Sequence, residues 1–123
     1  MNYLLFCGAV LGLISVVFGA AGDHFIELTP KQSDSFDTAI RYNMLYAVLI
    51  ICIALVREVN ISKQLSKWLL ITGLIFTVGT VLFSFSIYAS VITNISEITY
   101  IVPFGGLMLM AGWISTMLCS FKK

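Results

Sequence analysis

The sequence predicts an all-α, integral membrane four-helix bundle, with residues 1–123 forming a single transmembrane domain. Charged residues make up 11% of the chain and hydrophobic residues 59%, whereas a soluble domain carries about 25% charged residues. The apolar residues also lie in four continuous runs, at about residues 3–21, 36–56, 68–92 and 101–120. Each run is near the roughly 20 residues with which a helix crosses a bilayer. Because the runs do not alternate with a period of two, a transmembrane barrel is excluded.

The first run, residues 3–21, is predicted to be a retained helix with a small-residue face. It has no basic residue before it and exceeds the roughly 7–15 apolar residues of a signal peptide. Small residues recur on one face at steps of 4, 3, 4 and 3, which lets another helix approach closely. We expect Gly105 and Gly112 of the fourth helix to be the partners, although glycine is also generally frequent in membrane helices. The face consists of Gly8, Gly12, Ser15, Gly19 and Gly22.

Polar residues open the second helix, predicted over residues 36–56. Before it, Thr29 is a plausible N-cap and Pro30 a first helical residue of a turn or short helix. Arg41 is expected at the level of the lipid headgroups. Asn43 lies deeper and is the most polar side chain expected inside the bundle, where its amide needs hydrogen-bond partners.

The third and fourth helices, predicted over residues 68–92 and 101–120, carry further polar and small residues. Trp68 is expected to anchor the third helix at the membrane interface. Hydroxyls on one face of that helix can bond either to a neighbouring helix or back to their own backbone. This face consists of Gly73, Thr77, Thr80, Ser84 and Tyr88.

The basic residues predict an orientation. Five of them, at positions 57, 63, 67, 122 and 123, lie on one side of the membrane, and two, Lys31 and Arg41, lie on the other. Because cytoplasmic segments carry the excess of lysine and arginine, we expect both termini and the second connection in the cytoplasm.

A candidate binding site is predicted at the outer half of the bundle, where the first helix ends and the second begins. We expect its members to approach one another as a hydrogen-bonded network or small pocket, because a short connection makes consecutive helices antiparallel neighbours. The alternative is that these residues only staple the helix ends. The predicted members are His24, Asp23, Arg41, Tyr42, Asn43 and Ser84.

Metal, cofactor and nucleic-acid sites are not predicted. The chain has one histidine, and a zinc site normally needs three or four protein ligands. Cys7, Cys52 and Cys119 lie far apart inside apolar runs and form no CxxC motif. A net charge of +1 leaves no basic face for nucleic acid.

Several sequence blocks resemble one known family. Gly19-Ala20-Ala21-Gly22-Asp23-His24 resembles a GAFGAH signature, and residues 38–46 resemble a TAxxYQxxH block. Residues 82–88, 103–106 and 111–113 resemble LFSGSLY, PxGG and GW. These blocks are typical of the YgdD/YwdK-like family of small bacterial inner-membrane proteins, a domain of unknown function. The resemblance implies four transmembrane helices and a bacterial inner membrane, but supplies no activity, substrate or cofactor.

The chain departs from the family pattern at four positions. Tyr46 stands where a second histidine is usual, which argues against a metal held by two histidines. The other departures replace alanine, glutamine and glycine of the family pattern by Asp23, Asn43 and Phe85.

Three classes of function follow from these observations. The favoured interpretation is a structural or accessory membrane component whose partners are the lipid bilayer and other membrane proteins or a second copy of the chain. The alternative is binding or transport of a small molecule, ion or lipid through the outer polar pocket, because polar groups inside a membrane are functional candidates. An enzyme is disfavoured and no catalytic residue is predicted: Asp23 and His24 are adjacent, and adjacent helical residues point about 100° apart.

Overall fold

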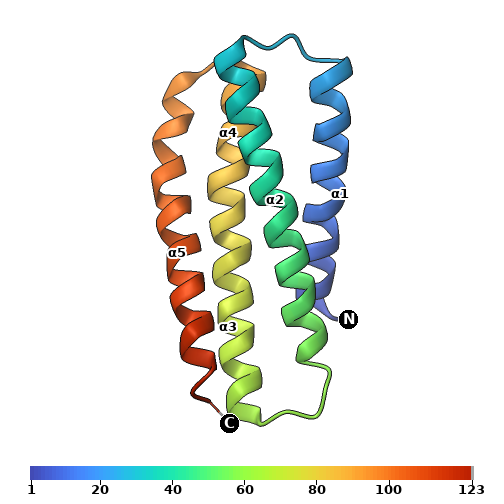
Figure 1. Ribbon diagram of the computed structural model, residues 1–123, viewed down its shortest axis with the longest axis vertical. Helices are drawn as coiled ribbons and strands as arrows, with labels where there is room; N and C mark the ends of the chain where they lie inside the picture. Colours follow the sequence, from blue (N-terminus) through green and yellow to red (C-terminus); the bar gives the residue numbers. More distant parts are fainter. Residues whose placement is uncertain (123) are drawn as a thin grey trace.

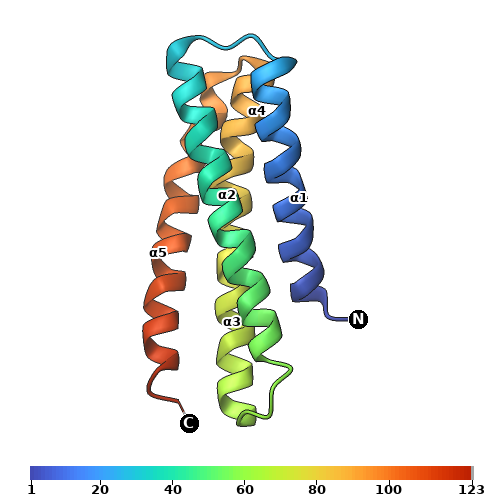
Figure 2. The ribbon, with the colours of Figure 1, turned by 45° about the vertical axis from the view of Figure 1, so that its right-hand side comes forward.

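A computed structural model describes residues 1–122, with the side chain of Asp23 left out of the description. Every element in the described part of the chain is helical, and the helices form an upright bundle (Figure 1). Both termini lie at one end, which we call the terminal end, and the opposite end is the distal end (Figures 1 and 2). The elements are α1 (Tyr3–His24), α2 (Pro30–Val56), α3 (Lys63–Thr80), the π-helix η1 (Val81–Phe85), α4 (Ser86–Thr93), the 3-10 helix η2 (Ser96–Ile101) and α5 (Val102–Cys119).

The described residues form four segments that are long and apolar enough to span a membrane. α1 and α2 each form one span, α3, η1 and α4 join into the third, and η2 with α5 forms the fourth. The prediction of an all-α membrane four-helix bundle is therefore confirmed. α2 has 27 residues and is about 40 Å long, so it extends beyond a hydrocarbon core of about 30 Å.

Capping residues set the start of α2, six residues before the predicted start at residue 36. The Thr29 side chain accepts a hydrogen bond from the Gln32 N–H at 3.2 Å, and the Gln32 side chain accepts one from the Thr29 N–H at 3.1 Å. This reciprocal pair is a capping box. The predicted N-cap at Thr29 and first helical position at Pro30 are confirmed, but they begin the second helix itself.

The third helix also begins earlier than residue 68, because Ser62 caps it. The Ser62 hydroxyl accepts from the Leu65 N–H at 3.1 Å, and α3 starts at Lys63. Hydropathy marks only the part of a helix that faces lipid, whereas the cap marks where the helical backbone starts.

The third span contains a π-helical turn, Val81–Phe85, which the hydropathy pattern does not reveal. A π-turn inserts an extra residue and rotates the face that follows it. Before the turn, the hydroxyls of Thr77 and Thr80 donate to the carbonyls of Gly73 and Phe76. After it begins, Ser84 bonds across to α2. Both of the hydrogen-bonding modes expected for this face therefore occur.

The first helix packs against α2, and the prediction that it packs through Gly105 and Gly112 is wrong. At Gly8 a Cβ would lie 3.1 Å from the Ala47 carbonyl oxygen, whereas at Gly12 it would have only an ordinary 3.8 Å contact with the Ala47 Cβ. Gly105 and Gly112 instead face η1 and α3. The short connection between α1 and α2 makes them antiparallel neighbours, which leaves α5 to cover α3 on the other side.

Gly19 does not lie at a close helix contact, so its predicted packing role is wrong. A Cβ on Gly19 would meet nothing within 4 Å. α1 and α2 diverge toward the distal end in both views (Figures 1 and 2). The rings of Phe18 and Phe36 fill the space between them, with centroids 5.9 Å apart. Large aromatic side chains there hold the two backbones apart.

Two apolar clusters form the core. One surrounds Phe76 and Ile50 in the half near the termini, and the other surrounds Phe36 and Tyr88 near the distal end. Large apolar side chains of α1 and α5 point outward, Phe6 and Phe104 among them. A contiguous apolar exterior is unfavourable in water and suits a helix bundle that is surrounded by lipid.

Candidate functional site

The buried polar residues Asn43 and Ser84 connect α2 to the third span. The Asn43 Nδ2 donates to the Tyr88 hydroxyl at 3.0 Å, and the Ser84 hydroxyl donates to the Ala39 carbonyl oxygen at 2.8 Å. Asn43 and Ser84 are both 0% exposed. They lie between the two apolar clusters along their helices, so they form a polar layer near the middle of the core.

One atom of this layer lacks a partner. Among the buried side-chain nitrogen and oxygen atoms of the described residues, only the Asn43 Oδ1 makes no hydrogen bond. An unpaired buried carbonyl carries a desolvation penalty of about 1–3 kcal/mol. Asn43 therefore depends on its bond to Tyr88 to offset the cost of lying in an apolar core.

Arg41 and Tyr42 lie on a different face of α2 from Asn43. Both are exposed, and they line a shallow surface cavity of about 270 Å³ together with Thr38 and Leu45. Consecutive helical residues are about 100° apart, so residues 41, 42 and 43 cannot all point toward one neighbour. The geometry of the helix therefore directs the side chains of Arg41 and Tyr42 away from the face that buries the Asn43 amide.

His24 lies apart from both groups. It is exposed in the last turn of α1, and its ring has an edge contact with Phe25 at 6.4 Å between centroids. The expectation that His24, Arg41 and Asn43 form one cluster is therefore wrong. Only Asn43 and Ser84 share the interior. The side chain of Asp23, also predicted at this site, lies outside the described residues.

Two further polar connections join α5 to the bundle, and the sequence analysis did not anticipate them. The Trp113 indole N–H donates to the Tyr46 hydroxyl at 2.8 Å, which connects α5 to α2. The hydroxyls of Thr72 and Ser115 are hydrogen-bonded to each other, which connects α3 to α5. Membrane helices associate through packing and such interhelical bonds rather than through the hydrophobic effect. The sequence feature that could have indicated these bonds is a polar side chain, on each of the two helices, at a position that faces another helix.

The Asn43–Tyr88 bond yields a testable prediction. Replacing Tyr88 by phenylalanine should lower the free energy of unfolding by about 1 kcal/mol, a value typical of hydrogen bonds between membrane helices. The reason is that the Asn43 amide would lose the one side-chain partner that it has among the described residues. Reversible unfolding in mixed detergent–lipid micelles measures the change. Tyr100→Phe is the matched control because Tyr100 is 75% exposed, and an equal loss in both variants would contradict the prediction.

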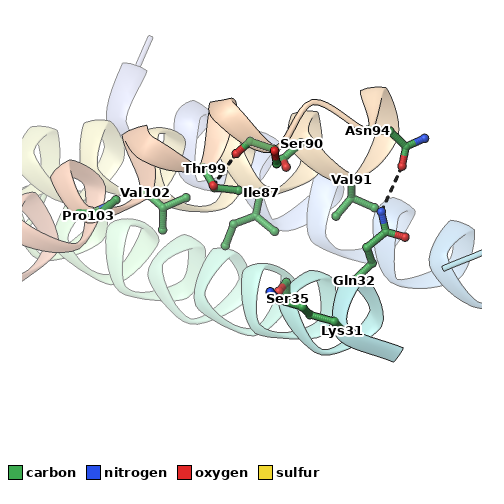
Figure 3. A pocket seen from close by; sticks show the side chains of 11 residues that line it. Lys31, Gln32, Ser35, Ile87, Ser90, Val91, Asn94, Thr99, Val102 and Pro103 are labelled. Carbon is green, nitrogen blue, oxygen red and sulfur yellow. Dashed lines mark hydrogen bonds between the residues drawn. The ribbon is translucent and has the colours of Figure 1, made fainter. Parts of the chain in front are cut away.

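A larger cavity of about 580 Å³ lies at the distal end, between α2, α4, η2 and α5 (Figure 3). The Gln32 Nε2 donates to the Asn94 Oδ1 at 3.1 Å across its outer edge. Asn94 ends α4 in the left-handed conformation, with φ 57°, which asparagine tolerates better than most residues. This distal cavity was missed because its lining residues come from α2 and from the consecutive elements α4, η2 and α5, which lie more than 50 residues away from the α2 lining residues in the sequence.

The described residues hold no group of three or more histidine, cysteine, aspartate or glutamate side chains placed to bind a metal. The cysteines are not paired: Cys7 is half-buried, Cys52 exposed and Cys119 buried. The buried polar side chains described above are uncharged amides and hydroxyls, which can bind by hydrogen bonding.

Comparison with known proteins identifies relatives along almost the whole chain. A 31% identical protein, the UPF0382 membrane protein SH2409 of Staphylococcus haemolyticus, aligns over 99% of this chain and 98% of its own length. A UPF0382 membrane protein of Haemophilus influenzae is also 31% identical, over 99% of this chain and 96% of its own. The UPF0382 inner membrane protein YgdD of Escherichia coli is 27% identical over 91% of this chain and 84% of its own length. No solved structure matches.

A family profile matches as well. The family described as "Protein of unknown function (DUF423)" matches residues 18–106, which include four of the five sequence blocks noted above. The resemblance to YgdD-like proteins is thereby confirmed. The family description assigns no reaction and no ligand. On the extent of these matches, the chain belongs to the DUF423 family of membrane proteins.

Proposed function

We propose that the protein is a structural or accessory component of the membrane, which packs against lipid and other membrane proteins and does not carry a solute through its own interior. The observation that supports this proposal is the uncharged interior. No buried residue in the described part of the chain is aspartate, glutamate, lysine, arginine or histidine. The buried polar residues are Ser15, Asn43, Thr72, Thr80, Ser84, Ser86 and Ser115.

The hydrogen bonds of these residues favour a fixed scaffold. Ser15, Thr80 and Ser86 donate back to carbonyls of their own helices, so these three hydroxyls are already hydrogen-bonded within the bundle. Ion and proton pathways usually contain ionisable groups within the spans. An interior of internally bonded hydroxyls is better suited to holding helices together than to passing ions.

Reconstituted vesicles test the choice between scaffold and transporter. We expect proteoliposomes loaded with a pH-sensitive or K⁺-sensitive dye to leak no faster than protein-free vesicles. Asn43→Leu, which removes the most polar buried group, should leave that leak unchanged. A saturable ion flux that disappears in Asn43→Leu would contradict the proposal.

Photo-crosslinking in cells tests the accessory role directly. A photoreactive amino acid at Leu107, which is 58% exposed on α5, should give crosslinks to lipid and to a discrete protein. The same probe at Leu109, two residues along and 5% exposed, is the matched control for position and expression. Crosslinks to lipid alone from Leu107 and from further exposed positions on α1 would contradict a role in packing against other proteins.

We also propose that the protein is a multi-pass protein of the bacterial inner membrane with both termini in the cytoplasm. The similarity to the E. coli inner membrane protein YgdD supports the location. The terminal end carries Arg57, Lys63, Lys67 and Lys122, whereas the distal half carries Lys31 and Arg41. The excess of basic residues at the terminal end supports this orientation.

Cysteine labelling provides the prediction that tests the orientation. In a variant without the three native cysteines, Asn60→Cys should react with a membrane-impermeant maleimide only after the cells are lysed. Glu97→Cys should react in intact cells, because it lies at the distal end. Both positions are exposed, so a lack of reaction reflects sidedness and not burial. The reverse labelling pattern would show the opposite orientation.

A further inference from the structure

The distal cavity contains a candidate binding site that differs from the predicted one. It lies between α2 on one side and η2 with α5 on the other, and α4 joins the two sides (Figure 3). Lys31, Thr99 and Pro103 line it and are exposed, so the cavity is accessible from outside the bundle. Its volume of about 580 Å³ is within the roughly 300–1,000 Å³ of typical ligand sites.

Polarity changes along this cavity. Lys31, Gln32 and Asn94 lie at its outer end, whereas Ile87 and Val102 lie farther toward the middle of the bundle (Figure 3). Among the described residues that line the cavity, Lys31 is the only charged one. A positively charged end and an apolar end match a ligand that has an anionic head and an apolar tail.

The depth of the cavity matches the boundary between headgroups and acyl chains. α2 is about 40 Å long and the hydrocarbon core about 30 Å thick. The first turn of α2, which contains Lys31, therefore reaches the headgroup region. Ile87 and Val102 lie farther from this end of the bundle (Figure 3), where we expect the surrounding solvent to be hydrocarbon.

Two hydroxyl groups in the cavity have no hydrogen-bond partner within the described part of the chain. Thr38 in α2 and Ser86 and Thr93 in α4 donate to carbonyls of their own helices. Ser35 and Ser90 line the cavity and make no such bond among the described residues. Their hydroxyls are therefore available as hydrogen-bond donors to a ligand.

We propose that this cavity binds one glycerophospholipid of the surrounding bilayer. The phosphodiester lies beside the Lys31 ammonium, and the hydroxyls of Ser35 and Ser90 donate to its phosphate or ester oxygens. The first methylenes of an acyl chain lie on Ile87 and Val102. A single lysine matches the single negative charge of a phosphodiester, and lysine near a membrane surface attracts anionic lipid. This inference deepens the proposed lipid-packing role by naming a specific lipid site.

A site-specific titration tests the proposal. The full-length protein, purified and freed of lipid in detergent, is titrated with dioctanoyl phosphatidylglycerol while the backbone amide NMR signals of Ser90 and Asn94 are followed. We expect saturable shifts at both amides. Replacing Lys31 by glutamine should raise the dissociation constant about fivefold, the effect of one lysine near a lipid phosphate. Lys31 is exposed, so this variant should fold.

Matched controls distinguish the contribution of the phosphate to binding from that of the acyl chains and from a nonspecific effect of the protein's charge. Lys67→Gln removes an equal charge beside a smaller cavity of about 290 Å³ at the terminal end and should leave the dissociation constant at the distal site unchanged. Dioctanoylglycerol, which has the same chains without the phosphate, should bind at least fivefold more weakly. Ser90→Leu should block the cavity, with the Asn94 amide as the readout.

Five results would overturn the proposal, and the first four concern the strength of binding. These four are an unchanged dissociation constant in Lys31→Gln, an equal loss in Lys67→Gln, equally tight binding of dioctanoylglycerol, and equally tight binding of glycerol 3-phosphate alone. The last result would identify a site for a free phosphate ester. NMR signals of the Ser90 and Asn94 amides that shift with protein concentration and not with added lipid would instead indicate that a second copy of the chain occupies the cavity. None of these results affects the vesicle flux that tests the proposed scaffold role.

Discussion

Replacement of Gly105 by alanine is expected to destabilise the bundle by about 3 kcal/mol, the upper part of the usual range for overpacking. An added Cβ would lie 2.7 Å from the Phe83 Cα and 2.8 Å from the Leu82 carbonyl carbon. Both are backbone atoms of the π-helical turn, so neither can rotate away as a side chain would. α5 would have to separate from η1, which would also weaken the contacts around it.

Gly106→Ala is the matched control for this prediction. It makes the same chemical change one residue along the same helix, and its Cβ would meet nothing within 4 Å. Because alanine is the better helix former, we expect this variant to be as stable as the wild type or slightly more stable. Reversible unfolding of both variants in mixed micelles measures the difference, and equal stability of the two would show that α5 does not approach the π-turn so closely.

Replacement of Phe76 by alanine should cost about 3 kcal/mol, the lower end of the range for aromatic-to-alanine changes in protein cores. Phe76 is 0% exposed. Its ring stacks on Tyr46, with centroids 5.3 Å apart, and makes an edge contact with Trp113 at 5.6 Å. The lower end applies because membrane helices gain packing energy without a hydrophobic contribution.

Phe104→Ala controls for the loss of an aromatic ring in itself. Phe104 is 65% exposed on α5 and faces the surroundings of the bundle. We expect its replacement to change the free energy of unfolding by less than about 0.5 kcal/mol, as at other surface positions. If Phe104→Ala were as damaging as Phe76→Ala, the assignment of interior and lipid-facing sides of the bundle would be wrong.

Three of the five blocks that carry the family resemblance meet around the π-turn. Gly105, from the PxGG-like block, lies against the backbone of Leu82 and Phe83 in the LFSGSLY-like block. Ser84 in that block donates to the Ala39 carbonyl in the TAxxYQxxH-like block. These contacts assign the three blocks a role in helix packing, and they support the interpretation of the protein as a scaffold.

The spans and one helix start could be predicted from local sequence. A run such as residues 3–21 has to be helical in lipid, because only an internally bonded backbone satisfies its own polar groups there. Thr29 and Pro30 were recognisable as a cap because a capping box uses residues three positions apart. The start of the second helix was nevertheless placed too late, since hydropathy does not register a polar first turn outside the hydrocarbon core.

The candidate site was predicted only in part. Asn43 was expected to be buried with a partner, and Tyr88 is that partner. His24 was grouped with it because both were expected at similar depth, but His24 ends α1 at the distal end, whereas Asn43 lies at the middle of α2. The distal cavity could not be predicted at all, since Lys31, Ser90 and Thr99 come together only when three separate helical segments pack.

By itself, the sequence determined that this protein has four membrane-spanning helices and which groups are polar enough to need partners. Both properties depend on the free energy of transferring a local chain segment from water into lipid. This free energy is a sum over residues that are neighbours in the sequence. The tertiary structure alone decided that Gly8 faces α2 while Gly19 faces open space, and that Gly105 meets a π-turn. Helix pairing depends on the rotation and crossing of rigid helices, and small residues at a face permit a close contact without specifying its partner.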